Sequence, residues 1–272
     1  MRKTHTGRSG MTVDTGTQTI VRMPRGGPDA SWLSRRLQTD RPEYLDRDDV
    51  DVLKQKVVRA IDRGGRRGTY EKYARMALDE VEHRSMPKIL ELGCGLGGLA
   101  RKLLELHPTA EVTITDVDAS FTSAIAAGDL GRHARATVRV MDATDIDAAD
   151  GSFDLAVFAL SLHHLPPDSA ARVFAEGTRV AHKLMIVDVH RPSPPLHLAM
   201  LAAAMPFTRI AVIHDAVISG LRAYSTSALE ALARHADPAI DLEFRPRRIG
   251  PTVLLAQRHQ QTNSVSHGGR ID

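Results

Sequence analysis

Carboxylates, histidines and glycines recur in this 272-residue sequence directly after short apolar runs. A glycine-rich turn, GCGLGG, follows the run KILEL, and acids follow the next two runs, at Asp116 after VTIT and at Asp142 after VRVM. A histidine pair, His163 and His164, follows FDLAVFALSL. If these runs are parallel strands, their carboxyl ends meet at one edge of a sheet, which is where open α/β sheets bind ligands.

The glycines of the turn have a direct physical reading. Gly93, Gly95 and Gly97 lack side chains that would block a ligand from the backbone, and the helical pattern after them directs its first amide groups toward that ligand. Gly93, Gly95 and Gly98 also satisfy GxGxxG, the dinucleotide fingerprint. The turn alone therefore leaves a nicotinamide dinucleotide open as the ligand.

The neighbouring acids narrow the choice of ligand. Asp116 ends the expected second strand, where a carboxylate can accept both hydroxyls of a ribose, and a nicotinamide enzyme would share this feature. Glu91 lies two residues before the first glycine, near the position of a cationic amino group, and Asp142 is placed to accept from an adenine amino group. These two acids are not ordinary features of a nicotinamide site.

Short apolar runs alternate with helical patterns after residue 87, which predicts βαβ units. We therefore expect an α/β, Rossmann-like fold with a seven-stranded, mostly parallel sheet and helices on both faces. The expected strands cover residues 88–92, 111–117, 137–141, 153–160, 184–189, 240–244 and 252–256. The expected helices of this core cover residues 98–106, 119–127, 168–181 and 226–236.

The remaining segments break this alternation. Helical periodicity predicts helices over about 48–60 and 69–82, separated by glycines. Prolines among Leu, Ala and Met after residue 190 predict an inserted helical cap. The expected order is a disordered tail (1–30), an N-terminal helical lid region (31–86), the Rossmann-like ligand-binding core (87–190), the cap (191–225), the closing helix and strands of the core (226–258) and a second tail (259–272).

Composition excludes several classes of protein. The formal net charge of +3 reflects 36 basic and 33 acidic side chains, and aromatic residues make up only 4%, so no nucleic-acid partner is expected. The single cysteine, Cys94, forms no internal disulfide and leaves too few thiolates for a structural zinc site. Without an apolar run of about 18 residues or a signal peptide, we expect a cytoplasmic protein without a membrane partner.

Four segments in this order, ILELGCGLGG, TDVD, MDATDI and FDLAVFALSLHHL, resemble motifs I to IV of the class I S-adenosylmethionine-dependent methyltransferases. The resemblance covers residues 70–190 and, by pattern, the closing strands to 257. It implies S-adenosyl-L-methionine as the cofactor. The cofactor-binding residues that it implies are Glu91, Gly93, Cys94, Gly95 and Gly97 around the methionine end, Asp116 and Val117 at the ribose, Asp142 and Ala143 at adenine, and Ala159 and Leu160 beside the sulfonium. Asp118 replaces Asp116 as the ribose ligand if the strand end is shifted.

Methyl transfer needs a general base only if the acceptor arrives protonated. His163 and His164 follow the fourth strand, where an acceptor would approach, and each could instead only hydrogen-bond a loop. His214 in the expected cap is a second candidate for the base, because Asp215 could orient its ring. His182, His190 and His197 lack the spacing of metal ligands, so no metal is expected.

The apolar cap predicts the kind of acceptor. Its side chains include Leu198, Leu201, Met205, Phe207, Ile210 and Val212. We therefore expect a small hydrophobic or aromatic metabolite that bears a hydroxyl or acid group, with O-methylation slightly favoured. An NAD(P)-dependent oxidoreductase or a catalytically silent cofactor-binding module is the alternative. An exposed apolar lid is also compatible with a homodimer.

Overall fold

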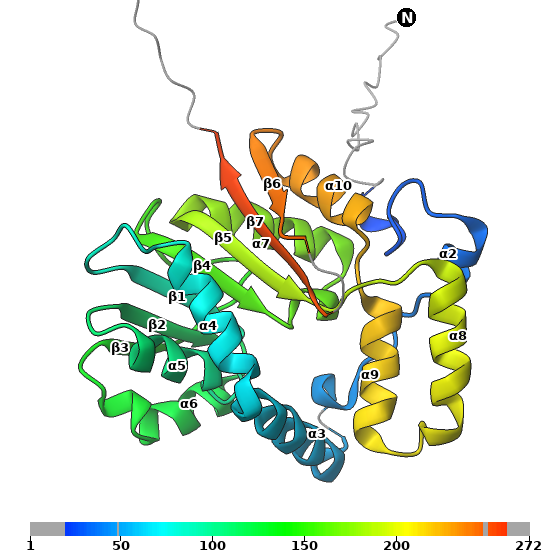
Figure 1. Ribbon diagram of the computed structural model, residues 1–272, viewed down its shortest axis with the longest axis horizontal. Helices are drawn as coiled ribbons and strands as arrows, with labels where there is room; N and C mark the ends of the chain where they lie inside the picture. The colour runs from blue at the N-terminus through cyan, green and yellow to red at the C-terminus, as the bar shows by residue number, and fades with distance from the viewer. Residues whose placement is uncertain (1–19, 48, 247–249, 260–272) are drawn as a thin grey trace, which may run out of the picture.

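The structure is a computed structural model that describes residues 20–47, 49–246 and 250–259. Within these residues a seven-stranded sheet is covered by helices on both faces (Figure 1). The strand order is β3-β2-β1-β4-β5-β7-β6. The strands are β1 (Lys88–Leu92), β2 (Glu111–Asp116), β3 (Ala136–Val140), β4 (Phe153–Ala159), β5 (Ala181–Asp188), β6 (Ile240–Phe244) and β7 (Thr252–Arg258). The Rossmann-like fold predicted from the sequence is confirmed.

The direction of the strands explains where a ligand can bind. Strands β1 to β5 are parallel, whereas β7 runs antiparallel to both β5 and β6. The chain builds outward from β1 to β2 and β3, and then crosses to β4 on the other side of β1. The order therefore reverses between β1 and β4, and open sheets bind ligands beyond the carboxyl ends at such a point.

Two apolar layers cover the two faces of the sheet. Neighbouring strand residues alternate between them, as Ile89 and Leu90 do in β1, because successive side chains point to opposite faces. One layer holds side chains of α4 (Tyr70–Asp79), α5 (Gly98–Leu106) and α6 (Ala119–Ala127), and the other holds α7 (Pro167–Val180) and α10 (Thr226–Ala236). The helices predicted at 98–106, 119–127 and 226–236 have the observed bounds, and α7 lies one residue earlier than predicted.

The N-terminal helices lead toward the carboxyl edge of the sheet. Their elements are α2 (Trp32–Arg36), η1 (Tyr44–Asp46), α3 (Asp51–Gly64) and η2 (Gly65–Thr69), which joins α4. Gly68 has a φ of 119°, which favours glycine and interrupts the helical path between α3 and α4. Lys54 of α3 lies 3.5 Å from the Asp118 carboxylate after β2, so α3 reaches over the binding edge.

Residues 20–30, which the sequence assigned to a disordered tail, are packed onto the core. Ile20 and Met23 are buried in the apolar layer of α7 and α10. Arg25 is also buried, lies 4.7 Å from the ring centroid of Tyr224 and donates to the His163 carbonyl oxygen. The prediction was wrong here because a few separated side chains carry this packing, without any periodic pattern. Residues 1–19 and 260–272 lie outside the described residues.

The segment after β5 is helical, as predicted, with α8 (Pro194–Ala204), η5 (Met205–Phe207) and α9 (Ala211–Arg222). In Figure 1, α8 and α9 lie side by side beyond the sheet, and α9 packs against α3 and η1. Arg191 fastens this cap to the N-terminal region, because its guanidinium donates to the carbonyl oxygens of Leu37 and Ala223 at 2.8 and 3.0 Å. No helix among the described residues has both the length and the apolar content needed to cross a membrane.

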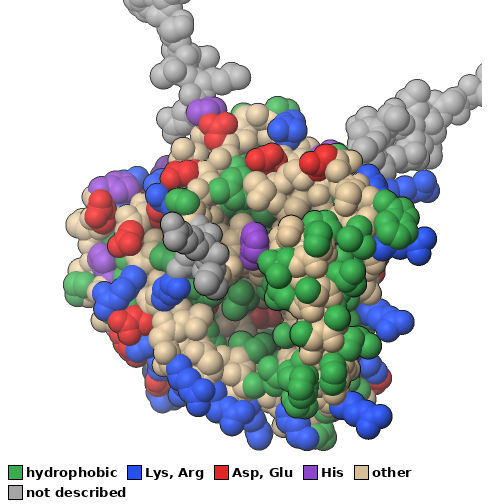
Figure 2. Space-filling view, turned by 45° about the vertical axis from the view of Figure 1, so that its right-hand side comes forward, with side chains coloured by type: hydrophobic (Ala, Val, Ile, Leu, Met, Phe, Trp, Pro, Cys, Tyr) green, Lys and Arg blue, Asp and Glu red, His purple; other side chains and the backbone are tan. Residues whose placement is uncertain are grey.

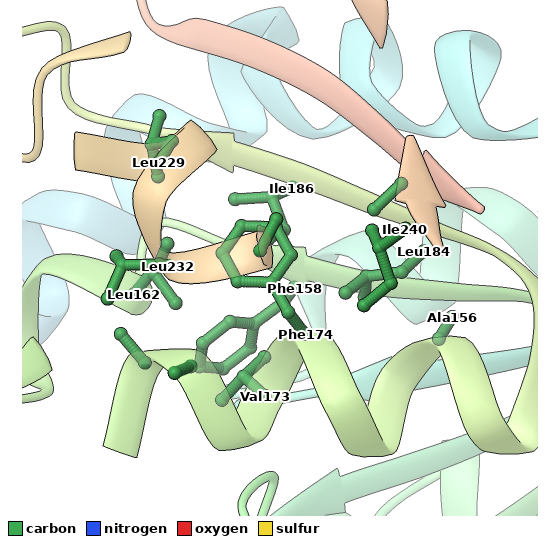
Figure 3. Packing of buried hydrophobic residues seen from close by; sticks show 14 of the residues in the cluster. Ala156, Phe158, Leu162, Val173, Phe174, Leu184, Ile186, Leu229, Leu232 and Ile240 are labelled. Carbon is green, nitrogen blue, oxygen red and sulfur yellow. The ribbon is translucent and has the colours of Figure 1, made fainter. Parts of the chain in front are cut away.

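The core behind the carboxyl edge is closely packed. Figure 3 shows side chains of α7, α10 and the strands meeting around Phe158 and Phe174. Phe174 is fully buried, whereas Val140 on the edge strand β3 is 57% exposed. Burial of these side chains holds α7 against the strands whose ends form the binding edge.

We expect Phe174→Ala to lower the free energy of unfolding by about 3–5 kcal/mol, since it removes a buried ring and leaves a cavity. The matched exposed variant, Val140→Ala, should change it by less than about 1 kcal/mol. Urea titration followed by circular dichroism measures both variants. An equal loss in the two would contradict this view of the core.

Candidate active site

A cavity of about 570 Å³ opens beyond the carboxyl ends of β1, β2 and β4. Its volume lies within the range of roughly 300–1,000 Å³ that is usual for small-molecule sites. Figure 2 shows the molecule hollowed here, with hydrophobic side chains gathered beside the hollow. The cavity brings together most of the predicted site residues, namely Glu91, Gly93, Cys94, Gly95, Asp116, Val117, Asp142, Ala143, Ala159, Leu160, His163 and His164. Of the predicted residues, Gly97 and His214 do not line it.

The three glycines of the turn have different tasks. Gly93, Gly95 and Gly97 have φ values of 64°, 52° and 72°, in the left-handed region that favours glycine. A Cβ on Gly95 would meet no atom within 4 Å, so its backbone is open to a ligand. A Cβ on Gly97 would lie 2.9 Å from Leu130 and 3.1 Å from Ile125. Gly97 therefore allows close packing of the turn, away from the cavity.

Two acids, Asp116 and Asp118, lie at the end of β2, and their carboxylate oxygens make different hydrogen bonds. One Asp116 oxygen accepts the Gly95 N–H and the other accepts the Asp118 N–H, each at 2.9 Å. Asp116 is buried and thus fastens the glycine turn to β2. Asp118 caps α6 by accepting the Ser120 N–H, lines the cavity and lies beside Lys54. Its carboxylate is the freer of the two to accept hydroxyl groups.

Glu91 presents a buried acceptor to the cavity. It is only 4% exposed, and its Oε2 has no hydrogen-bond partner among the described residues. Burial raises the pKa of Glu91 to about 8, although an Ala100 backbone N–H opposes this, and the Asp116 charge adds to the rise. A cationic amino group in the cavity would satisfy this orphaned oxygen. Burial also raises the pKa of the neighbouring Cys94 thiol, which keeps it from acting as a nucleophile.

The wall formed by the end of β4 holds an unusual backbone conformation. Leu160 has a φ of 56°, and it is the only non-glycine residue with a positive φ in the described part of the chain. Its N–H donates to the Val187 carbonyl oxygen at 2.7 Å, which keeps this conformation in place. Such conformations cost of order 1 kcal/mol or more and gather at functional sites. Ala159 and Leu160 both line the cavity.

His163 is held by the end of β5. It lies in η4 (Leu162–His164), where Asp188 accepts its backbone N–H at 2.8 Å and its ring Nδ1 lies 2.6 Å from the same carboxylate. Its Nε2 lies 3.4 Å from Glu43. Burial favours the neutral ring, but the carboxylates of Asp188 and Glu43 outweigh it and raise the pKa of His163 to about 9.

His164 is held by the N-terminal region. Its Nδ1 lies 2.7 Å from Asp46, which also accepts from the Arg222 guanidinium. Burial works against ionisation of Asp46, but His164 and Arg222 hold the pKa of this carboxyl well below its usual range. The side chain of His164 is 20% exposed, so it is the more accessible histidine of the pair.

Glu43 and Asp46 are site residues that the sequence analysis missed. Glu43 is 2% exposed, lines the cavity and accepts from the Ser219 hydroxyl at 2.8 Å. Asp46 ends the short 3-10 turn η1 and Glu43 precedes its first residue, about 120 residues before the histidines, and no sequence pattern indicates that they meet. Asp188 was also missed, but it ends an apolar run as Asp116 does, and this signal could have identified it.

His214 and Asp215 form the side-chain pair suggested by the sequence, with 3.0 Å between His214 Nδ1 and Asp215 Oδ1. This pair does not line the cavity. The His214 ring stacks on Tyr44 with centroids 4.4 Å apart, and Asp215 accepts the Tyr44 backbone N–H. These contacts fasten η1 to α9. The geometry therefore gives His214 a positioning role near Glu43 and Asp46.

The buried Glu91 predicts a pH dependence of stability. Its pKa rises on folding from 4.5 to about 8, so between these values the folded chain holds a proton that the unfolded chain releases. The free energy of unfolding without ligand should therefore fall as the pH rises from about 5 to 8, and Glu91→Gln should remove this contribution. Urea titrations across this pH range, compared between the two proteins, measure it. Parallel curves would contradict the burial of an acid at this position.

Residues 89–183 match the family described as a methyltransferase domain. The chloroplastic tocopherol O-methyltransferase of Arabidopsis thaliana is 32% identical over 109 residues, which are 38% of this chain and 31% of that protein. Malonyl-[acyl-carrier protein] O-methyltransferase of Geobacter sulfurreducens is 37% identical over 93 residues, 34% of each chain. This chain thus spans about a third of the length of the curated relatives it matches.

A solved structure shares the fold. The crystal structure of a Nostoc punctiforme PCC 73102 protein, proposed to be an O-methyltransferase, has a TM-score of 0.52 at 17% identity, covering 70% of this chain and 55% of that one. At this identity the likeness shows the fold alone. Together with the match over residues 89–183, it shows that this part of the chain is similar to the class I S-adenosylmethionine-dependent methyltransferases, a family that uses S-adenosyl-L-methionine as methyl donor.

Proposed function

We propose that this chain transfers a methyl group from S-adenosyl-L-methionine to an oxygen atom of a small hydrophobic or aromatic metabolite. The observation that carries the proposal is the composition of one cavity. Its β1 and β2 side holds the orphaned Glu91 oxygen and the open backbone of Gly95, and its other side holds Glu43, His163 and His164. A donor and an acceptor can therefore lie in the same cavity.

The cofactor fits the first side by charge. Its amino group would pair with Glu91, its ribose hydroxyls with Asp118, and its adenine would lie by Asp142 and Ala143. In this arrangement Asp116 positions the turn while Asp118 contacts the ribose, which is the alternative that the sequence had left open.

The same charges disfavour the nicotinamide alternative. Besides Glu91, the described lining includes Asp116, Asp118 and Asp142, and Lys54 is the only lysine or arginine in it. The pyrophosphate of a dinucleotide is anionic and would meet these carboxylates. S-adenosylmethionine instead carries a cationic sulfonium and a cationic amino group, so the field of the cavity attracts it.

The acceptor region is apolar, but not for the reason expected from the sequence. Large apolar side chains of α8, η5 and the start of α9 face outward, and Leu198, Met205, Phe207, Ile210 and Val212 are 40–63% exposed. None of these lines the cavity. Its apolar lining comes instead from other elements, with Leu45, Val58, Ile61, Leu165 and Val189. These side chains support a hydrophobic acceptor, while the outward face is where a homodimer contact would form.

The chemistry requires alignment more than activation. The methyl carbon is transferred in line from sulfur to the acceptor, so a cavity that fixes both partners supplies much of the rate. A hydroxyl acceptor must also lose its proton, and Glu43, His163 and His164 are the polar groups on the acceptor side. Oxygen is favoured as the acceptor atom because both curated relatives are named as O-methyltransferases.

We expect Asp118→Ala to weaken binding of S-adenosylhomocysteine about tenfold or more, since it removes charge-assisted hydrogen bonds to the ribose. Asp116→Ala should instead lower the melting temperature, because it frees two backbone amides of the turn. Isothermal titration and thermal unfolding of both variants measure these effects. Unchanged affinity in Asp118→Ala would show that this acid does not contact the cofactor.

Incubation with isotope-labelled S-adenosylmethionine and an extract of host metabolites tests the whole proposal. A labelled, apolar product with an ether or ester methyl group is expected. Parallel titrations with S-adenosylhomocysteine and NAD show which cofactor binds. Binding of NAD alone would support the oxidoreductase, and tight S-adenosylhomocysteine binding without any labelled product would support the silent binding module.

A further inference from the structure

Three potential metal ligands converge on the acceptor side of the cavity. One ligand atom from each of Glu43, His163 and His164 can be chosen so that all three lie within 4.8 Å of one another. The Nε2 of His163 lies 3.4 Å from one Glu43 oxygen, and the Nε2 of His164 lies 4.0 Å from the other. Two imidazoles and one carboxylate are a ligand set that suits divalent transition metals.

The spacing fits an ion better than a direct hydrogen bond. A hydrogen bond between nitrogen and oxygen measures about 2.7–3.2 Å, and both Nε2 distances to Glu43 are longer. Ligand atoms that surround one zinc ion at about 2.0–2.2 Å lie roughly 3–3.5 Å from each other. His163 and Glu43 already have this separation, and His164 is the partly exposed member that can move closer.

Outer carboxylates orient both rings toward this point. The Nδ1 of His163 lies 2.6 Å from Asp188, and the Nδ1 of His164 lies 2.7 Å from Asp46. With a proton kept on each Nδ1, a bound ion takes the place of any proton on each Nε2 and uses the lone pair of that nitrogen. Carboxylates that bind the far nitrogen of a histidine are the usual second layer of metal sites.

We infer that Glu43, His163 and His164 bind a divalent transition-metal ion that holds the acceptor's oxygen in the cavity. All three residues line the cavity, so the remaining coordination positions of the ion face the space that an acceptor would occupy. Glu43 is also buried and fixed by Ser219, which keeps the third ligand in place.

The ion would make the acceptor's hydroxyl more acidic, as bound metals do for water. The hydroxyl proton leaves to solvent, and the oxygen keeps the electron pair of the broken O–H bond. That oxygen then uses an electron pair to form the bond to the methyl carbon, while the carbon–sulfur bond breaks and its pair stays on sulfur as a thioether. This step needs no other reactant. The step rests on the proposed function, but binding of the ion is independent of that function.

Zinc binding to the full chain tests the inference without any turnover. After removal of metals by a chelator and dialysis into Zn²⁺, we expect about one Zn²⁺ per chain by elemental mass spectrometry. His164→Ala and Glu43→Gln should each weaken binding at least about tenfold in competition with a chromogenic chelator. Co²⁺ in place of Zn²⁺ should give a visible absorption band that these variants lose.

His83→Ala is the matched control, because His83 is exposed in the turn after α4 at the opposite end of β1. It should bind Zn²⁺ as the parent chain does, and circular dichroism checks that every variant is folded. Absence of bound Zn²⁺ in the parent chain, or equal binding in His164→Ala and His83→Ala, would overturn the inference.

The outcomes also separate this inference from the proposed function. If methyl transfer persists at full rate in the presence of a chelator, the proposed function is supported and a role for the metal ion is contradicted. If Zn²⁺ binds stoichiometrically but no methylated product forms, the metal site is supported and the proposed methyl transfer is contradicted.

Discussion

The carboxylate of Asp188 holds together the carboxyl edge of the sheet, where the cavity lies. With one group at the end of β5 it binds both the backbone and the ring of His163, and so joins the turn after β4 to the neighbouring strand. The opposite side of this turn is held by cations, since Arg25 and Arg222 both donate to the His163 carbonyl oxygen. Buried charges remain stable only where each has partners, and this network supplies them from four distant parts of the chain.

This network explains why residues 20–46 pack against the Rossmann-like core. Arg25 reaches the turn from the N-terminal segment, and Asp46 reaches His164 from η1. The cap contributes Arg222, which binds both Asp46 and the turn, together with Asp215, which holds η1. The acceptor side of the cavity is therefore assembled from segments outside the Rossmann-like core, whereas the cofactor side lies within it.

The same division decides what could be predicted from the sequence. The strands and the glycine turn were predictable because their periodicity and conformational needs are local, and Glu91, Gly95 and Asp142 follow from their positions at strand ends. The partners of the histidines could not be predicted, because Glu43 and Asp46 meet them only after the chain has folded. The apolar cap was predicted as helix, but hydrophobicity alone could not indicate that many of its large apolar side chains face outward.

Electrostatics links the two sides of the cavity. Without a ligand, Glu91 is buried with an orphaned oxygen, and this arrangement costs free energy that a cationic ligand can recover on binding. A carboxylate placed in this way favours a cationic amino group beside it. The carboxylates around the histidines act in the same direction, since Asp188 and Glu43 favour positive charge on the His163 ring and raise its pKa to about 9. The buried acids thus bias the cavity toward binding positive charge at each end.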